Sequence, residues 1–309
     1  MSGPDTVMPV LPGLLVIEQL HRGHHVNVYD VWSEERGCRC VAKTLRPDRP
    51  RDEKSVRDLM REGRLLSQLT HPHIVRLYEA VRAPVPVVLL ETLSGHTLAS
   101  LLDEHDCLPV QDVLHLGLHL TSAIGYLHRQ GWLHLDLKPS NVIADGGRAK
   151  LIDLSIARRP GRRRPGIGTP GYLSPEQALG HPLGPAADVW GIGGLLYEAI
   201  TGDPAVPDTK SRSSVSSSSR SHERRRTTTG GAVTIVAPGS LPRRRRVPTE
   251  VRRLIDACLT LDPAARPTIP EMAATLAAAL DSTPVPFADA SATAARPDGT
   301  STPAQKPAR

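Results

Sequence analysis

The sequence predicts an α+β protein, in which short strands of an antiparallel sheet precede helices. Three observations predict this order of elements. Short β-type runs alternate with turn residues over residues 14–41. Apolar residues then recur at helical spacing over residues 56–69, and a longer helical pattern occupies residues 113–130.

The predicted elements follow from local composition in chain order. The early strands are runs of β-branched, aromatic and other apolar residues separated by Gly, Asn and charged turn residues. A later apolar run leads into a polar segment and is predicted to be a further strand. The strands are predicted over residues 14–17, 26–32, 39–42 and 87–91, and the helices over residues 56–69 and 113–130.

The length and hydropathy of the chain fit a globular protein. Its 309 residues can bury a large core as one big domain or as two lobes. No run of about 18 apolar residues is present to span a bilayer. The first twelve residues lack the basic-then-apolar order of a secretory signal. We therefore expect a cytoplasmic protein without a transmembrane segment.

Cysteine usage argues against a disulfide scaffold and against a zinc site. The chain has four cysteines, too few for a disulfide framework. Cys38 and Cys40 lie on one predicted strand, and no second ligand pair follows at zinc spacing.

The net charge of +6 is concentrated in one segment. Residues 208–246 hold ten Lys or Arg against two acidic residues, so they carry +8 and the remainder of the chain carries −2. Their Ser- and Arg-rich composition predicts a disordered insert, and residues 281–309 predict a flexible tail. Clustered arginines could contact nucleic acid or anionic lipid. The insert has no aromatic residue for base stacking, which argues against specific recognition of single strands. Its composition favours a solvated, disordered loop.

The most informative stretch runs from His134 to Asn141 with the sequence His-Leu-Asp-Leu-Lys-Pro-Ser-Asn. The carboxylate of Asp136 precedes the carboxamide of Asn141 by five residues, and Asp153 follows beyond a short predicted hairpin. Such a set suits phosphoryl transfer from a metal-bound nucleotide. One acid can accept a hydroxyl proton, while the amide oxygen and the other acid hold magnesium.

This stretch resembles the catalytic loop and the metal loop of the eukaryotic-like (Hanks-type) serine/threonine protein kinases, in their bacterial style. The resemblance covers residues 14–280, interrupted by the insert. It implies the bilobal protein kinase fold, with a small antiparallel β lobe with one main helix over residues 14–91 and a larger, mainly helical lobe over residues 92–280 that contains the insert 208–246. Residues 1–13 and 281–309 would be tails.

The resemblance assigns the catalytic roles residue by residue. Asp136 would position the substrate hydroxyl and accept its proton, and Lys138 would neutralise the γ-phosphate. Asn141 and Asp153 would ligate Mg²⁺, with Mn²⁺ as an alternative, since hard cations prefer oxygen ligands. Thr169, in Gly-Thr-Pro-Gly-Tyr, would bond to Asp136 and Lys138.

The resemblance also implies an ATP-binding site in the small lobe. Lys43, which ends the run Val-Ala-Lys, would bind the α- and β-phosphates, and Glu62 lies nineteen residues later on the predicted helix as its ion-pair partner. Leu90 would guard the back of the pocket. The remaining predicted nucleotide contacts are the backbone of Glu91 and Leu93, the side chains of Val28, Ala42 and Ile143, and Gly23 of the phosphate lid.

The lid departs from the family pattern. Only the middle glycine, Gly23, is present, and His21 and Val26 replace the flanking glycines. A β-branched valine does not accept the positive φ angles that glycine accepts, so a differently shaped phosphate contact is expected. The histidines of the lid could contact phosphate, although three histidines in an exposed turn are more often only solvated.

A second departure concerns the activation segment. Leu135 stands where many kinases have an arginine that receives a phosphorylated loop. Residues 156–168 contain no Ser, Thr or Tyr to accept phosphate, and they hold five arginines. The joint absence predicts an active conformation that needs no loop phosphorylation. The five arginines of the segment predict a preference for substrates with acidic residues near the phosphoacceptor.

Three further charged residues match structural positions of the family. Glu176 needs a buried partner, which is predicted to be Arg266. Asp188 is predicted to cap the backbone of the catalytic loop. With these positions filled, the sequence favours an active serine/threonine protein kinase that uses ATP on a protein substrate. The alternative is a pseudokinase, a nucleotide-binding or scaffolding module that has lost turnover with its lid.

Overall fold

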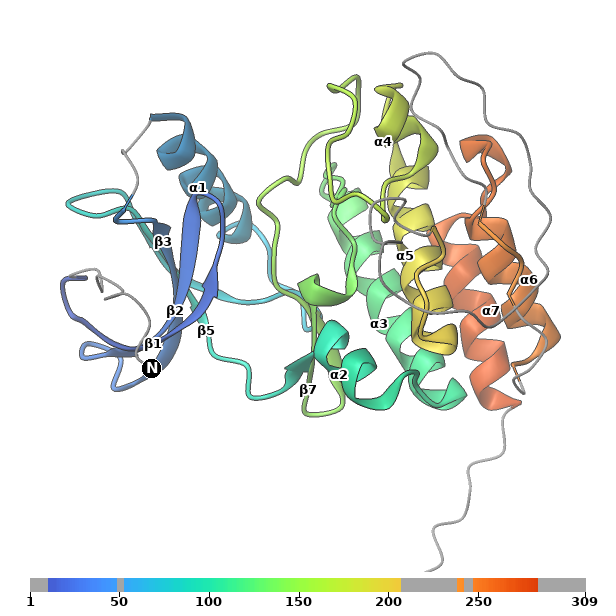
Figure 1. Cartoon of the computed structure of the whole chain (residues 1–309), viewed down its shortest axis with the longest axis horizontal. Coiled ribbons are helices and arrows are strands. Elements are labelled where there is room, and N and C mark those ends of the chain that lie inside the picture. Colours follow the sequence, from blue (N-terminus) through green and yellow to red (C-terminus); the bar gives the residue numbers. More distant parts are fainter. Residues whose placement is uncertain (1–10, 49–52, 207–237, 242–246, 283–309) are drawn as a thin grey trace, which may run out of the picture.

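The computed structural model describes residues 11–48, 53–206, 238–241 and 247–282. These residues form a β-rich lobe and a helical lobe side by side (Figure 1). The predicted α+β, bilobal architecture is therefore confirmed. The predicted tails 1–13 and 281–309 lie almost entirely outside the described residues.

The small lobe is a five-stranded antiparallel sheet in the order β1-β2-β3-β5-β4. Alternation along each strand divides its side chains between two faces. In β5, Val88 and Leu90 join the main core, whereas Val87 and Leu89 join a separate cluster on the other face. The strands are β1 (Leu14–Arg22), β2 (Val26–Ser33), β3 (Cys38–Leu45), β4 (Leu77–Val81) and β5 (Val87–Glu91).

Helix α1 (Glu53–Leu66) packs its apolar stripe toward the main core. The stripe contains Val56, Leu59 and Leu66, at the helical spacing that predicted the element. The helix ends three residues before the predicted boundary at residue 69. After the helix ends, the Leu69 N–H donates to the Leu66 carbonyl (3.1 Å), and this bond to the third preceding residue forms a tighter turn than the α-helix.

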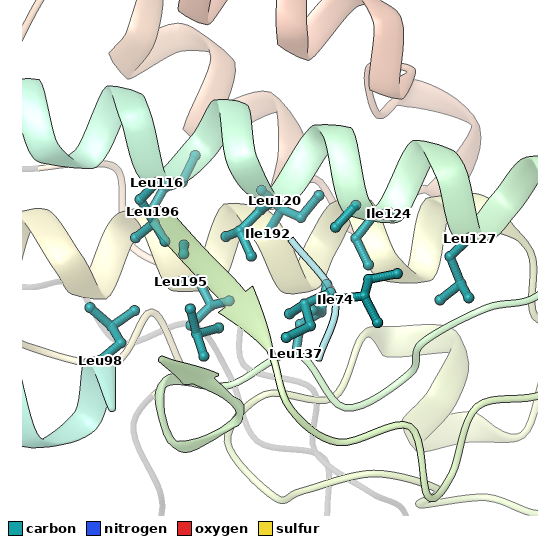
Figure 2. Packing of buried hydrophobic residues seen from close by; sticks show 14 of the residues in the cluster. Ile74, Leu98, Leu116, Leu120, Ile124, Leu127, Leu137, Ile192, Leu195 and Leu196 are labelled. Carbon is teal, nitrogen blue, oxygen red and sulfur yellow. The ribbon is translucent and has the colours of Figure 1, made fainter. Parts of the chain in front are cut away.

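The large lobe is built around α3 (Val110–Arg129) and α5 (Pro185–Thr201), with α6 (Thr249–Cys258) and α7 (Ile269–Asp281) packed outside them. Gly193 lets α6 approach α5 closely, because a Cβ there would lie 2.5 Å from the Cβ of Cys258. Figure 2 shows the apolar layer that joins these elements to the catalytic loop. It contains Leu116, Leu120, Ile124 and Leu127 of α3, Ile192, Leu195 and Leu196 of α5, and Ile74, Leu98 and Leu137.

Seven short elements complete the described part of the large lobe. A three-stranded sheet in the order β6-β7-β8 lies next to α2, at the edge of the large lobe that faces the small lobe (Figure 1). A capping box between Ser174 and Gln177 starts α4. The elements are β6 (His96–Thr97), α2 (Leu98–His105), η1 (Pro139–Asn141), β7 (Val142–Asp145), β8 (Arg148–Leu151), α4 (Pro175–Leu179) and η2 (Pro263–Ala265).

Within the predicted insert 208–246, the structure describes residues 238–241 only. Leu241 is buried there, and its N–H donates to Asp256 Oδ1 (3.1 Å) while its carbonyl accepts from Arg252 Nη1 (3.1 Å). This end of the predicted insert is thus packed against α6. None of the described helices has the length and hydrophobicity needed to cross a lipid bilayer.

Candidate active site

Lys43 and Glu62 form the predicted ion pair between β3 and α1. Lys43 Nζ lies 2.7 Å from Glu62 Oε1, and both side chains are buried. Lys43 also donates to the Ile152 carbonyl (3.2 Å) and lies 3.8 Å from Asp153 Oδ1. Burial acts to lower the pKa of Lys43, but the attraction of Asp153 and Glu62 outweighs it and raises this pKa. Lys43 is therefore kept in its charged form close to the carboxylates of both Glu62 and Asp153.

Asp153 follows β8 and points at Lys43. Burial acts to raise the pKa of Asp153, but the charge of Lys43 and the hydrogen bonds of Ser155 outweigh it and lower this pKa. One of those bonds runs from the Ser155 N–H to Asp153 Oδ1 (2.7 Å). The carboxylate is thus kept ionised, as a metal ligand must be.

Asp136 lies at the centre of a hydrogen-bonded group in the catalytic loop. Thr169 Oγ1 donates to Asp136 Oδ1 (2.6 Å), and Lys138 Nζ lies 3.0 Å from Asp136 Oδ2. Lys138 Nζ also donates to Thr169 Oγ1 (2.8 Å). The group fixes a carboxylate, an ammonium and a hydroxyl in one place, which suits a site where a substrate hydroxyl gives up its proton.

Asn141 and Asp153 carry the oxygen atoms that could ligate a divalent cation. Asn141 Nδ2 donates to the Asp136 carbonyl (2.9 Å) and to Asp136 Oδ2 (3.0 Å), so the amide nitrogen faces Asp136 and the amide oxygen is the atom that could ligate a cation. The Ile152 N–H donates to the Asn141 carbonyl (3.1 Å) and so holds the two ligands near each other. In the described part of the chain, no three His, Cys, Asp or Glu side chains form an all-protein metal site. Mg²⁺ does not need one, because nucleotide phosphates and water complete its shell.

Asp188 of α5 holds the catalytic loop from below. Its carboxylate accepts the His134 N–H and the Leu135 N–H, both at 2.8 Å, and its Oδ2 lies 2.8 Å from His128 Nε2. The predicted cap is therefore present. It also explains the backbone of Leu135, whose φ of 68° is unusual for a side chain other than glycine.

The family of the chain follows from a comparison with protein-family models. The protein kinase domain matches residues 14–276, which include every catalytic position described above. The chain belongs to the protein kinase family.

Several curated kinases resemble this kinase domain over about half of the chain or more. The probable serine/threonine-protein kinase SCO3848 of Streptomyces coelicolor is 34% identical over 198 residues, covering 60% of this chain and 29% of the relative. Serine/threonine-protein kinase 36 of Mus musculus is 33% identical over 194 residues, covering 61% and 15%. Serine/threonine-protein kinase PknB of Mycobacterium leprae is 33% identical over 176 residues, covering 53% and 28%. The chain therefore spans less than a third of the length of each of these relatives.

One predicted nucleotide contact of the kinase needs correction. Ala42 pairs with Tyr29 and Leu89 across the sheet and is buried with them on the face turned away from Lys43. Successive side chains on a strand point to opposite faces, so the residue that shares a face with Lys43 is Val41. Val41 packs against the main core. Val41, not Ala42, is the β3 residue placed to close on a purine.

The remaining predicted purine contacts lie around the hinge. Val28 pairs with Lys43 and shares its face of the sheet. Leu90 is buried at the end of β5. The Glu91 N–H already donates to the Arg76 carbonyl (3.0 Å), so its predicted purine contact is limited to its carbonyl. Leu93 and Ile143 are half-buried, with Ile143 on β7 opposite Thr97.

The phosphate lid of the kinase is a tight hairpin. The Gly23 N–H donates to the Val26 carbonyl (2.9 Å), and a Cβ on Gly23 would lie 2.5 Å from that oxygen. Arg46 ties the turn to the end of β3 through a bond to the Gly23 carbonyl (3.2 Å). Gly23 is thus required by the turn itself, whatever it contributes to nucleotide binding.

The predicted partner of Glu176 is also in place. Arg266 binds Glu176 through two nitrogens, at 2.7 Å and 2.9 Å, and both residues are buried. Arg266 further donates to the Thr260 carbonyl (2.9 Å) and lies over the Trp190 ring at 5.0 Å. The pair fastens the end of the activation segment to the helical core.

Sequence reasoning missed Gln177, which joins two functional loops. Its Nε2 donates to the Leu135 carbonyl (2.8 Å) and to the Ile167 carbonyl (2.9 Å), so it links the catalytic loop to the activation segment. Its only sequence signal is the capping box Ser-x-x-Gln that starts α4, which predicts a helix end and no functional contact.

Proposed function

We propose that this protein is a serine/threonine protein kinase that transfers the γ-phosphate of ATP to Ser or Thr hydroxyls of a protein substrate, and that its active conformation does not depend on phosphorylation of the activation segment. The observation that carries the proposal is the joint formation of the Lys43–Glu62 pair and the Asp136–Lys138–Thr169 group in one structure. These two groups supply the positioning and charge stabilisation on which phosphoryl transfer depends.

The roles of the residues follow from their contacts. ATP bound with Mg²⁺ or Mn²⁺ supplies the transferable phosphoryl group. Asn141 and Asp153 would hold the cation through oxygen atoms, and Lys43 would bind the phosphates. Asp136 would orient the substrate hydroxyl and accept its proton, while Lys138 would balance the negative charge of the transferred group.

Independence from loop phosphorylation is supported by an apolar cluster at the activation segment. Leu135 is 4% exposed and is buried with Leu133, Leu183 and Ala187. Ile156 and Ile167 of the activation segment pack against the same cluster. Apolar contact thus joins the catalytic loop to the segment at the place where related kinases use an arginine and a phosphate.

Backbone contacts hold the same segment. The Leu133 N–H donates to the Arg158 carbonyl (2.7 Å), and the Arg158 N–H donates back (3.0 Å). The Gly161 and Leu183 backbones form a second such pair, at 2.9 and 3.0 Å. With Gln177, these bonds order the segment through uncharged groups, which supports an active arrangement without a phosphate.

The pseudokinase remains the second candidate because of the lid. His21 and Val26 occupy the places of two glycines, and the Gly23 N–H is bonded to the Val26 carbonyl within the turn. A poor lid would weaken phosphate binding while the metal and base residues stayed intact. We favour the enzyme, because those residues carry the larger contributions to catalysis.

The experiment compares the wild type with Asp136→Ala and Asp153→Asn in labelled ATP with Mg²⁺ or Mn²⁺, using a Ser/Thr peptide mixture and mass spectrometry of the protein itself. Label with the wild type and none with either variant supports the kinase. Nucleotide binding by thermal shift without any transfer, at both metals, supports the pseudokinase. Equal labelling by wild type and both variants would indicate a contaminating kinase and would refute the assigned roles.

A further inference from the structure

Four histidines gather where the loop after α1 meets α3 and β8, and the proposed function gives them no role. His71 and His73 belong to the loop, and His115 and His119 lie about one turn apart on α3. The rings of His73 and His119 stack, with centroids 4.1 Å apart and planes inclined by 22°. His71 stacks on Tyr126 of α3 at 5.0 Å. The stacked rings therefore bridge the loop and α3.

The backbone of Ala149 on β8 is bonded by both rings of the first stack. Its N–H donates to His119 Nδ1 (3.2 Å), and its carbonyl lies 2.9 Å from His73 Nδ1. Because a carbonyl can only accept, His73 Nδ1 carries a proton. Because a backbone N–H can only donate, His119 Nδ1 carries none, and a proton added there would break the bond to Ala149. We call His73, His119 and the Ala149 backbone the imidazole clamp.

The imidazole clamp lies where the loop after α1 is joined to β8. The Leu151 N–H donates to the His73 carbonyl (3.0 Å), and the Leu151 carbonyl accepts the N–H of the residue two positions further along the loop (2.8 Å). The loop follows the helix that carries Glu62, and β8 ends two residues before Asp153. Both carboxylates act on Lys43. A shift of β8 against the loop would therefore displace the groups that hold Lys43.

The surroundings of His119 disfavour its charged form. Burial lowers the pKa of His119 to about 4, and repulsion from His73, His115 and Arg148 acts in the same direction. The closed imidazole clamp thus contains a neutral His119 throughout the physiological pH range.

The second ring of the imidazole clamp has a similar environment. Burial lowers the pKa of His73, and the charges of Arg148 and Lys150 lower it further against the raising effect of the Ala149 carbonyl. Burial also lowers the pKa of His71, with help from His73. The charged and titratable groups next to these imidazoles are His115 and Arg129 of α3, Arg148 and Lys150 of β8, and Glu91 of β5, whose carboxylate is bound to Lys150 (2.6 Å).

We propose that His73 and His119 are positioning residues of the kinase reaction: in their neutral forms they hold β8 against the loop after α1, and protonation in mildly acidic solution opens the imidazole clamp and reversibly slows phosphoryl transfer. The inference rests on the proposed kinase function and adds a pH response to it. Both residues act through Glu62 and Asp153, so neither is a catalytic residue.

The direction of the response follows from the hydrogen bonds. In the closed imidazole clamp His119 does not accept a proton, whereas a His119 released from β8 accepts one as an exposed imidazole does, near pH 6.5. The open arrangement therefore binds more protons, and it gains population as the pH falls from about 6.5 towards 4. The rate should be highest above this range and should fall within it.

The test measures kcat and KM with ATP and one Ser peptide at about pH 7.5 and about pH 5.5, on either side of the ordinary histidine pKa. The full-length enzymes are the wild type, His119→Asn, His119→Leu and the control His115→Asn. Asn offers an acceptor oxygen close to the position of Nδ1 and does not titrate, whereas Leu removes the acceptor. His115 is an exposed histidine of the same helix outside the imidazole clamp. Titration of ATP and of the other groups of the site is common to all four enzymes.

We expect kcat/KM of the wild type to fall about tenfold more on acidification than kcat/KM of His119→Asn. At the higher pH, His119→Asn should stay within about twofold of the wild type, while His119→Leu should lose about tenfold in kcat with the KM for the peptide unchanged. His115→Asn should follow the wild type at both pH values, and returning the wild type to the higher pH should restore its rate.

Hydrogen exchange at the Ala149 and Leu151 amides, corrected for the intrinsic effect of pH, gives a readout that does not need activity. It should rise on acidification in the wild type and not in His119→Asn. Equal acid responses of these two enzymes in rate and in exchange, or full activity of His119→Leu at the higher pH, would overturn the inference and leave the kinase function intact.

Failure of the kinase function gives a different result. Acid-induced exchange in the wild type alone, without transfer to peptide at either pH, would support the imidazole clamp and refute the kinase function. If thermal unfolding shows that His119→Leu is unstable, the comparison of the wild type with His119→Asn decides, because Asn keeps the acceptor for the Ala149 N–H.

Discussion

Replacing Leu135 by Ala tests whether apolar contact sets the activation segment. Leu135 is 4% exposed, and its cluster joins the catalytic loop to Ile156 and Ile167. Leu→Ala substitutions at buried sites cost about 2 to 5 kcal/mol, and a small cluster that can partly collapse belongs near the lower end. If the whole of a 2 kcal/mol loss falls on the ordered segment, activity falls by roughly 30-fold, which is the largest effect that a loss of this size can have.

Chemical unfolding measures the stability of each variant. Steady-state kinetics with one peptide substrate are then measured under conditions well below the unfolding midpoint. The control is Leu276→Ala, because Leu276 is equally buried in α7 and lies in the core of the helical lobe. We expect both variants to lose stability and only Leu135→Ala to lose kcat/KM beyond threefold. Unchanged kcat/KM in Leu135→Ala, at a comparable loss of stability, would refute the reasoning.

Three further predictions concern the core, the pH response and the nucleotide cleft. Arg266→Ala leaves the buried carboxylate of Glu176 without its partner, so the free energy of unfolding should fall by about 3 to 5 kcal/mol; a fall under 1 kcal/mol in urea titrations would contradict this. Burial lowers the pKa of His119 to about 4, so the unfolded chain takes up a proton that the folded chain refuses, and stability should fall as the pH drops from about 6.5 towards 4. His119→Asn should flatten that dependence in thermal unfolding at stepped pH, and an unchanged slope would contradict it. Val41→Phe should weaken ATP binding at least tenfold by filling the purine space, whereas Ala42→Ser on the other face should change it less than twofold; the reverse order by calorimetry would restore Ala42 to the cleft.

The charged positions of the site could be predicted from the sequence because the motifs that carry them resemble those of the protein kinase family. Lys43 and Glu62 stand on a strand and a helix whose periodicities are visible, and their contact at 2.7 Å follows once those elements pack. The bond of Thr169 to Asp136 and the pair of Glu176 with Arg266 follow in the same way from family positions.

The error at Ala42 could have been avoided by the same periodicity. Side chains alternate along a strand, so a lysine that faces the cleft places its second neighbour, Val41, on the same face. The helix end at Leu66 was not visible, because the apolar pattern continues to Leu69, which is still buried after the helix has ended.

Other features depend on packing between distant segments and leave no local signal. The sequence predicts only a helix-capping role for Gln177, yet its side chain donates to carbonyls of the catalytic loop and of the activation segment. In the sequence, Leu135 shows only that the arginine found in many kinases is absent. The structure adds that Leu135 belongs to an apolar cluster at this position. In the sequence, Glu198 is one polar residue of a mostly buried helix; only the structure shows that Tyr172 donates to one of its oxygens and that the other has no hydrogen-bond partner among the described residues.

The central claim is that the kinase is active without phosphate on its activation segment. The most direct test treats the protein with phosphatase, verifies by mass spectrometry that it carries no phosphate, and follows peptide phosphorylation from the first seconds, with Asp136→Ala as the inactive reference. The account predicts a linear initial rate without a lag, and the same kcat/KM after prior incubation with ATP. A lag that prior incubation removes, or a wild-type rate no higher than that of Asp136→Ala, would contradict it.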